Sequence, residues 1–173
     1  IFGVQCEALP YATSYIPTSG SSVTRNADVC NNAGSSDLIN STEGVLYFEL
    51  KALTNGSSFR ALGLSNSTNS NAVNLLYRTQ SNQIWMQVKT NNVETNIFVY
   101  DVNQSQNNKI AIKYKENDFA LWVNGIKKGT NNNGLPPIGL ETLKFSRGDG
   151  GESFYGNVRS VAVFKEALTD EEL

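Results

Sequence analysis

The stretch KIAIKYKENDFALWVNGIKK, residues 109–128, carries the clearest structural pattern in the chain. Over residues 110–115 apolar residues alternate with Ala or Lys in steps of two, which is typical of a strand with one buried face. The polar turn Glu-Asn-Asp follows, and the alternation resumes over residues 119–123. Asn124-Gly125 then signals a further chain reversal. The pattern therefore predicts an antiparallel meander, the repeating unit of an all-β protein.

Similar short runs fill the rest of the chain, with turn-forming residues about every 8–12 positions, which is typical of a sandwich or barrel. Thr169-Asp-Glu-Glu172 has the spacing of a capping box and predicts the start of a helix. We expect about ten to thirteen short strands and almost no other helix. The other expected strands span residues 2–7, 44–53, 59–64, 73–79, 84–89, 94–102, 143–145 and 154–165.

Composition limits the class of protein. The 173 residues, 39% of them hydrophobic, suit one globular domain with a core of its own. A net charge of −2, without a basic cluster beyond Lys127-Lys128, argues against nucleic-acid binding. No apolar run approaches the roughly 20 residues that cross a bilayer, so we expect no membrane insertion. The start at Ile1 suggests a fragment of a longer chain, and Cys6 and Cys30 either pair or stay reduced.

Two segments resemble laminin G-like domains of the concanavalin A-like lectin/glucanase superfamily. Phe119-Ala-Leu-Trp-Val-Asn-Gly125 is similar to the "lYvNG" hairpin of these domains. Residues 155–172, YGNVRSVAVFKEALTDEE, are similar to their closing strand, "G-x-i-x-x-v-x-i-y-x-r-a-L-t-x-e-E". The resemblance covers roughly Thr42 to the end of the sequence. It implies an all-β, two-sheet antiparallel jelly-roll sandwich, spanning residues 1–173 as a single domain.

The front of the chain carries a second resemblance. Residues 3–7, 12–18 and 23–28 are similar to "GaQlE…atSYIPT…vTRaaD", a signature of phage and prophage virion proteins ahead of a laminin G-like domain. Cys6 stands where that family has an aliphatic residue. The resemblance implies a tail, fibre or head-appendage module located in the virion, with neighbouring virion proteins or domains as partners. Residues 1–18 are then either a linker or the last strand of a preceding domain.

Carboxylate spacing argues against catalysis. Laminarinase-type relatives place their acid and nucleophile as E-x-D-x-x-E or E-x-D-x-E on one strand, and no such run is present. Without histidine, the usual general base and most zinc sites are excluded. We therefore expect a protein that is not an enzyme and has no cofactor. Structural calcium stays open, because Asp101, Asp118 and Asp149 stand in loops rich in Asn and Gly, although without D-x-D-x-D spacing.

Aromatic side chains beside polar ones are the candidates for ligand binding, because sugar rings stack on flat π faces and hydrogen-bond to amides and guanidiniums. Alternation places Trp85 with Gln87 opposite an apolar face. The alternative is that these rings only cover a sheet or lie under a loop. The candidate residues are Trp85, Trp122, Tyr47, Tyr77, Arg78 and Gln87.

Three functions stay open at this point. The first is a non-catalytic adhesion module that recognises a host-surface glycan or polysaccharide. The second is a purely structural module that joins or decorates virion proteins without a ligand. The third is a glycan-binding module of a secreted bacterial enzyme, which would be extracellular and would have Cys6 bonded to Cys30.

Overall fold

The computed structural model describes residues 15–24 and 34–173. The chain divides into two compact units, Ile1–Asn31 and Asn32–Leu173. Within the first unit, the described residues 15–24 form neither helix nor strand and bend at 19–21, where Gly20 has a φ of 74°. The strand expected at 2–7, both cysteines and most of the expected linker lie outside the described residues. The division at residues 1–18 therefore stays a prediction.

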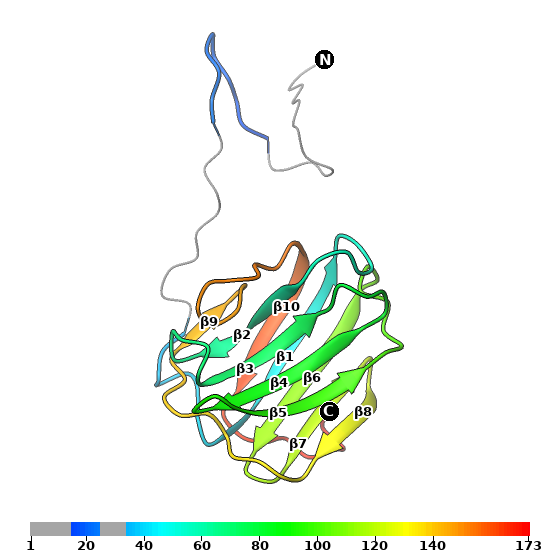
Figure 1. Ribbon diagram of the computed structural model, residues 1–173. Helices are drawn as coiled ribbons and strands as arrows, with labels where there is room; N and C mark the ends of the chain where they lie inside the picture. The colour runs from blue at the N-terminus through cyan, green and yellow to red at the C-terminus, as the bar shows by residue number, and fades with distance from the viewer. Residues whose placement is uncertain (1–14, 25–33) are drawn as a thin grey trace. The chain divides into compact units, whose positions relative to one another are not determined.

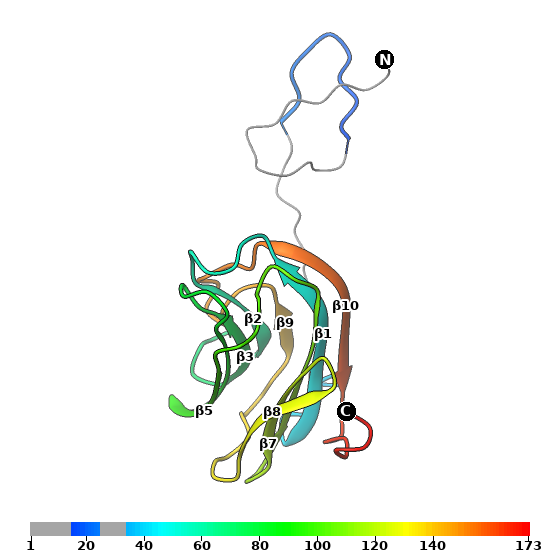
Figure 2. The same ribbon diagram turned by 90° about the vertical axis from the view of Figure 1, so that its right-hand side faces the viewer.

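Ten antiparallel strands make up the secondary structure of the described residues, in which no helix is present. Sheet I has the order β10-β1-β6-β7-β8, and sheet II has the order β5-β4-β3-β2-β9. Figure 1 looks onto sheet II with sheet I behind it, and Figure 2 shows the two layers edge-on. This confirms the predicted all-β, two-sheet antiparallel jelly-roll sandwich. The strands are β1 (Glu43–Ala52), β2 (Arg60–Ser65), β3 (Ala72–Tyr77), β4 (Ile84–Thr90), β5 (Val93–Val99), β6 (Asn108–Lys115), β7 (Phe119–Val123), β8 (Ile126–Asn131), β9 (Thr142–Lys144) and β10 (Gly156–Phe164).

The core lies between the two sheets and is built from every second residue of each strand. In β1 the inward side chains are Leu46, Phe48 and Leu50, all fully buried, as the alternation predicts. Both strands of the β6–β7 hairpin contribute in the same way. The remaining inward side chains include Leu62, Leu64, Val73, Leu75, Tyr77, Ile84, Met86, Val88, Ile97, Val99, Ile110, Ile112, Tyr114, Phe119, Leu121 and Val123.

The turns use residues that tolerate a left-handed backbone. Asn91 and Asn92, between β4 and β5, have φ values of 50° and 68°. Asn124 and Gly125, between β7 and β8, have 53° and 76°. Two consecutive positive φ angles match the twist of the flanking strands, so these hairpins form where the sequence predicts them.

A buried polar cluster closes one end of the sandwich. Gln104 is fully buried, and its side chain accepts a hydrogen bond from the Gly56 amide at 3.0 Å. Its amide nitrogen donates to the carbonyls of Arg78, Gln80 and Gln83 at 2.7–3.1 Å. One side chain thereby ties three loops to the ends of the sheets.

The helix predicted at Thr169 is wrong for the described residues, which form a single turn there. One of the two capping contacts is present, because the amide of Thr169 donates to the Glu172 carboxylate at 2.9 Å, whereas the Glu172 amide donates to the Thr169 carbonyl. Leu168 and Leu173 pack against the outer face of sheet I and hold this turn flat on it. Nor does any described segment form a helix long and apolar enough to span a bilayer.

Candidate functional site

Three of the predicted site residues, Arg78, Trp85 and Gln87, lie on the outer face of sheet II. Strands β3 and β4 turn Tyr77, Ile84 and Met86 toward the core, so the neighbours of these residues point outward. This places the two predicted polar groups beside the tryptophan, as the alternation requires. The outer face of sheet II is therefore the first candidate site.

Tyr77 is in a different place, and its predicted exposure is wrong. Its side chain is fully buried in the core, with its ring centroid 5.5 Å from that of Phe154. Burial raises the pKa of the Tyr77 hydroxyl, against a smaller opposing effect of the Arg60 charge. Tyr77 therefore contributes to packing and cannot contact a ligand on either outer face.

An aromatic row crosses sheet II on its outer face. Trp85 pairs directly with Leu76 on one side and with Phe98 on the other. The Trp85 and Phe98 rings meet edge to face with centroids 4.5 Å apart, a favourable geometry for two aromatic rings. Phe98 is 46% exposed, whereas the Trp85 indole N–H is enclosed and has no hydrogen-bond partner among the described residues. Phe98 is thus the more accessible ring of the row.

Arg78 extends the row because its guanidinium lies between two rings. The Cζ atom is 3.6 Å from the Trp85 ring centroid and 3.8 Å from that of Phe59, both within cation–π range. Burial lowers the pKa of Arg78, and the charge of Glu152 opposes this shift. The structure brings Arg78 and Trp85 together, but stacked on each other, so one face of Trp85 is already occupied.

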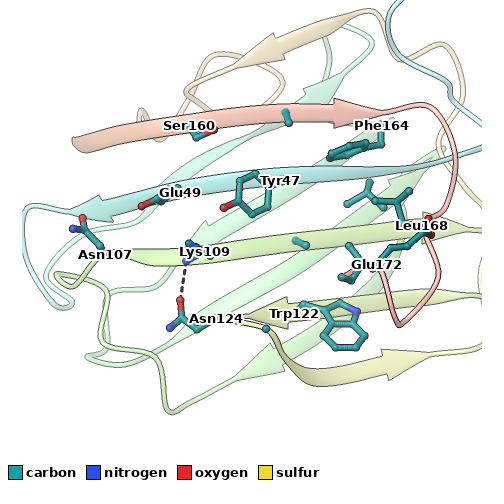
Figure 3. A pocket seen from close by; sticks show the side chains of 15 residues that line it. Tyr47, Glu49, Asn107, Lys109, Trp122, Asn124, Ser160, Phe164, Leu168 and Glu172 are labelled. Carbon is teal, nitrogen blue, oxygen red and sulfur yellow. Dashed lines mark hydrogen bonds between the residues drawn. The ribbon is translucent and has the colours of Figure 1, made fainter.

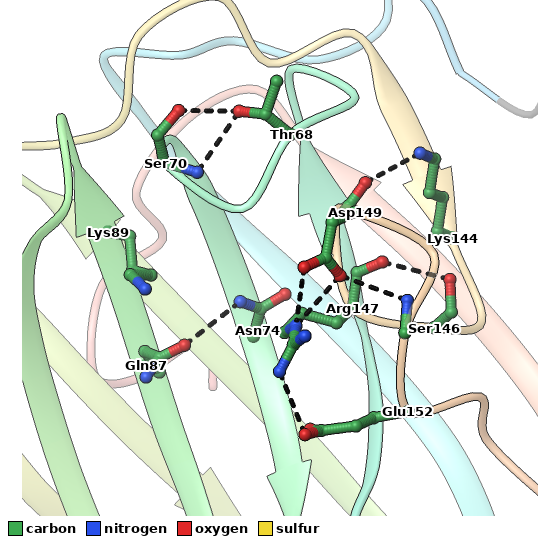
Figure 4. A network of polar contacts seen from close by, with 12 residues as sticks. Thr68, Ser70, Asn74, Gln87, Lys89, Lys144, Ser146, Arg147, Asp149 and Glu152 are labelled. Atoms are coloured by element: carbon green, nitrogen blue, oxygen red, sulfur yellow. Dashed lines mark hydrogen bonds and ion pairs between the residues drawn. The ribbon is translucent and has the colours of Figure 1, made fainter.

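A row of three amides runs beside the aromatic row. The register places Asn74 of β3, Gln87 of β4 and Asn96 of β5 directly opposite one another. Asn74 donates to Gln87 at 3.4 Å (Figure 4), and Asn96 donates to Glu94 at 3.0 Å. The Oδ1 atoms of Asn74 and Asn96 are enclosed without a partner among the described residues. Such side chains supply the donors and acceptors that a hydroxyl-rich ligand requires.

Ion pairs border the amide row on two sides. Arg147, on the loop that leads from β9 to β10, binds Asp149 at 2.9 Å and Glu152 at 2.9 Å (Figure 4). On the other side, Lys89 binds Glu94 at 3.3 Å. The hydrogen bond from Arg147 is the main cause that lowers the pKa of Asp149. The general acid of a glycosidase needs the opposite shift, so this carboxylate does not suit that role.

Four residues of this face were not singled out from the sequence: Phe59, Asn74, Asn96 and Phe98. Each belongs to a strand or strand end that was predicted, but its neighbours across the sheet depend on strand register. Alternation in β5 is the signal that places Asn96 and Phe98 on one face, because Ile97 and Val99 are buried.

Tyr47 and Trp122, the remaining predicted residues, lie on the outer face of sheet I. They line an open depression of about 780 Å³ over β10, β1, β6 and β7 (Figure 3). Tyr47 is half-buried near its centre, with Glu49 and Lys109 toward one end. Trp122 is only 9% exposed, and Lys127 covers its ring at 5.0 Å. The structure thus separates the predicted residues onto opposite faces of the sandwich.

The three aspartates considered for calcium are each paired with a cation. Asp118 binds Lys113 at 2.9 Å, and Asp101 binds Lys128 at 2.6 Å. Asp149 binds Arg147, as described above. Within residues 15–24 and 34–173, no group of three or more Cys, Asp or Glu side chains has the arrangement of a metal site. The expectation of no cofactor, with structural calcium left open, stays a prediction.

Comparison with solved structures gives the same fold in several other proteins. The CBM40 module of the Ruminococcus gnavus IT-sialidase, bound to α2,3-sialyllactose, matches with a TM-score of 0.64 at 17% identity, covering 78% of this chain and 82% of the module. The NanB sialidase of Streptococcus pneumoniae, as its K499G mutant, matches with a TM-score of 0.62 at 19% identity, covering 79% of this chain and 24% of the sialidase. A heptameric pentraxin of Limulus polyphemus matches with a TM-score of 0.58 at 16% identity, covering 78% and 69%.

Comparison with curated protein sequences found no match. The solved structures are all below 25% identity and therefore establish the fold alone. A family model described as the concanavalin A-like lectin/glucanases superfamily matches residues 32–173, which include both sheets. Together with the ten-stranded sandwich, this match shows that the chain belongs to the concanavalin A-like lectin/glucanases superfamily, in its laminin G-like branch.

Proposed function

We propose that the protein is a non-catalytic carbohydrate-binding module whose ligand binds on the outer face of sheet II. The observation that carries the proposal is the position of the aromatic row directly beside the amide row. Trp85 and Phe98 offer ring surface. Gln87 and Asn96, the next pair on the same face of β4 and β5, offer hydrogen-bonding groups. Stacking on rings combined with hydrogen bonds to amides is the usual way in which proteins bind sugars.

The fold supports this proposal without deciding it. The Ruminococcus gnavus module has the same sandwich and binds sialyllactose. For the present chain the support comes from its own outer face, where Phe98 is exposed and Trp85 and Gln87 are partly exposed. A ligand on this face would pack against the Phe98 ring and the free edge of Trp85. Neighbouring hydroxyl groups would then reach the side chain of Gln87.

We also propose that the module belongs to a phage structural protein and recognises a glycan on the host surface. The support is the similarity of residues 3–7, 12–18 and 23–28 to the front of virion proteins. The corresponding location is the virion, and the partners besides the glycan are neighbouring virion proteins. An extracellular module of a bacterial enzyme stays the alternative for location.

A glycan-array screen followed by titration calorimetry tests the binding proposal. Phe98→Ala and Trp85→Ala each remove a ring of the aromatic row, and we expect about a two- to tenfold loss of affinity, since stacking contributes about 0.5–1.5 kcal/mol beyond area burial. Tyr47→Ala is the matched control, because it removes a partly buried ring from the opposite sheet. Unchanged affinity in Phe98→Ala and Trp85→Ala, with the fold intact, would place the ligand elsewhere. A loss in Tyr47→Ala alone would move the site to sheet I.

A structural role without a ligand is the second candidate function, and the outer face of sheet I favours it. Phe164, on the edge strand β10, is 41% exposed and borders the depression beside Tyr47. Exposed apolar side chains on a strand edge are typical of contact surfaces. Absence of any glycan binding, together with association of the module with another virion protein that Phe164→Asp disrupts, would favour this role.

A further inference from the structure

Among the residues that the structure describes, Arg78 is a partly buried cation on the outer face of sheet II without an anionic partner. Two neighbouring cations are neutralised, Lys89 by Glu94 at 3.3 Å and Arg147 by Asp149 at 2.9 Å. Arg78 has neither a hydrogen bond nor an ion pair from its guanidinium to any residue that the structure describes. Its contacts are the two aromatic rings above and below the guanidinium plane.

The rings determine what Arg78 can still bind. Phe59 and Trp85 cover the two faces of the guanidinium at 3.8 and 3.6 Å, which fixes its plane. The Nε atom is enclosed and has no hydrogen-bond partner. The two Nη atoms are not enclosed in this way, so they form the open edge of the group. The open edge of a guanidinium is a planar fork of N–H donors that matches a carboxylate or sulfate.

A nearby acid does not already satisfy this fork. Glu152 is close enough for its charge to act on Arg78, but its carboxylate is bound to Arg147 at 2.9 Å. The open Nη donors of Arg78 can exchange water for an acceptor of the ligand, and a charged acceptor forms a stronger, charge-assisted hydrogen bond than a neutral one. An anionic group therefore gains more from this position than a neutral hydroxyl does.

We propose that Arg78 receives an anionic substituent of the saccharide, so that the module binds acidic glycans in preference to their neutral counterparts. This inference rests on the proposed function and adds the class of ligand. The anionic group is a carboxylate or a sulfate, since both match the same fork. Phe98 and Gln87 hold the sugar ring on the neighbouring strands, while Arg78 selects for its charge.

Paired charged and neutral ligands test the inference by titration calorimetry. The carboxylate arm compares trigalacturonate with its trimethyl ester and 3′-sialyllactose with its methyl ester, and the sulfate arm compares 6′-sulfolactose with lactose. We expect the charged member of at least one pair to bind about tenfold more tightly or better, the effect of about one charge-assisted hydrogen bond. The preference should weaken as the NaCl concentration rises.

Arg78→Gln should abolish the preference for the charged member and leave the neutral member unaffected. Arg78→Lys keeps the charge but loses the planar fork, and it should retain part of the preference. Arg159→Gln is the matched control, because Arg159 is 74% exposed and pairs with Glu49 on sheet I. Thermal unfolding of each variant checks that the fold is intact.

The outcomes separate this inference from the proposed function. Equal binding of charged and neutral ligands, or a preference that survives in Arg78→Gln, overturns the inference and leaves glycan binding standing. Absence of binding to every saccharide overturns the proposed function. In that case the Nε–H resonance of Arg78 is followed by NMR as sulfate is added. A saturable shift supports an anion site without a sugar, and no shift overturns that site as well.

Discussion

Two buried tyrosines make a matched test of the hydrogen bonding in the core. Tyr77 and Tyr114 are both fully buried between the sheets. The hydroxyl of Tyr114 donates to the carbonyl of Asn40 at 2.7 Å, whereas that of Tyr77 is enclosed without a partner among the described residues. The change from Tyr to Phe removes the same atom from both sites. The two variants should therefore differ in the sign of their effect on stability.

The magnitudes follow from what each hydroxyl does. Tyr114→Phe loses one hydrogen bond and leaves a carbonyl unpaired, which lowers the free energy of unfolding by about 1–2 kcal/mol. Tyr77→Phe removes a buried polar group that gains nothing in the folded state, so this free energy should stay unchanged or rise by up to about 1 kcal/mol. For a chain of this size, about 1 kcal/mol corresponds to a change in Tm of about 2–4 °C.

Urea unfolding followed by far-UV circular dichroism and by tryptophan fluorescence measures both free energies. Coincident transitions from the two probes and an unchanged slope against urea would show that the variants unfold in two states like the parent. If Tyr77→Phe destabilises the protein as much as Tyr114→Phe does, the reasoning is refuted, because Tyr77 must then have a partner such as a buried water.

Two further predictions concern polar contacts outside the aromatic row. Gln104→Ala should lower the free energy of unfolding by about 3 kcal/mol or more, because it leaves the Gly56 amide and several carbonyls without partners in a buried site. Urea unfolding measures this free energy. A loss below about 1 kcal/mol would contradict the proposed role of Gln104 in the cluster. Arg147 lowers the pKa of Asp149 in the folded state. The pair therefore stabilises the fold fully at pH values above the ordinary pKa of an aspartate. This stabilisation is lost as the pH falls through the lowered pKa of the folded state. Asp149→Asn should therefore reduce the steepness with which Tm falls below about pH 4, by a small amount because the pair is partly exposed. If Tm falls equally steeply below about pH 4 in the variant and the parent, the pairing makes no contribution to stability.

Much of the fold was predictable because its signals are local. In β1 and in the β6–β7 hairpin, alternation identified the buried face, and the structure has the same residues inside. Asn124-Gly125 formed the predicted reversal, since its left-handed backbone depends on the residues themselves. Both signals depend on residues only a few positions apart, so contacts with distant parts of the chain did not override them.

Errors arose where a local signal was ambiguous or was overridden. In β3, AVNLLY, leucines occur on both faces, Leu75 inward and Leu76 outward, so alternation there could not distinguish the buried Tyr77 from an exposed ring. At Thr169 one of the two capping contacts forms as expected, but the packing of Leu168 and Leu173 on sheet I decides the outcome. In each case the deciding contact comes from a distant part of the chain.

The candidate site shows the same division. The sequence alone determined that Trp85 and Gln87 share an outer face, because side chains in a strand alternate with a period of two. Only the tertiary structure decided that Phe98 lies beside Trp85, that Asn74, Gln87 and Asn96 form one row, and that Arg78 is held between two rings. The physical reason is that the register between strands is set by closing the sandwich as a whole, over separations that no local pattern specifies.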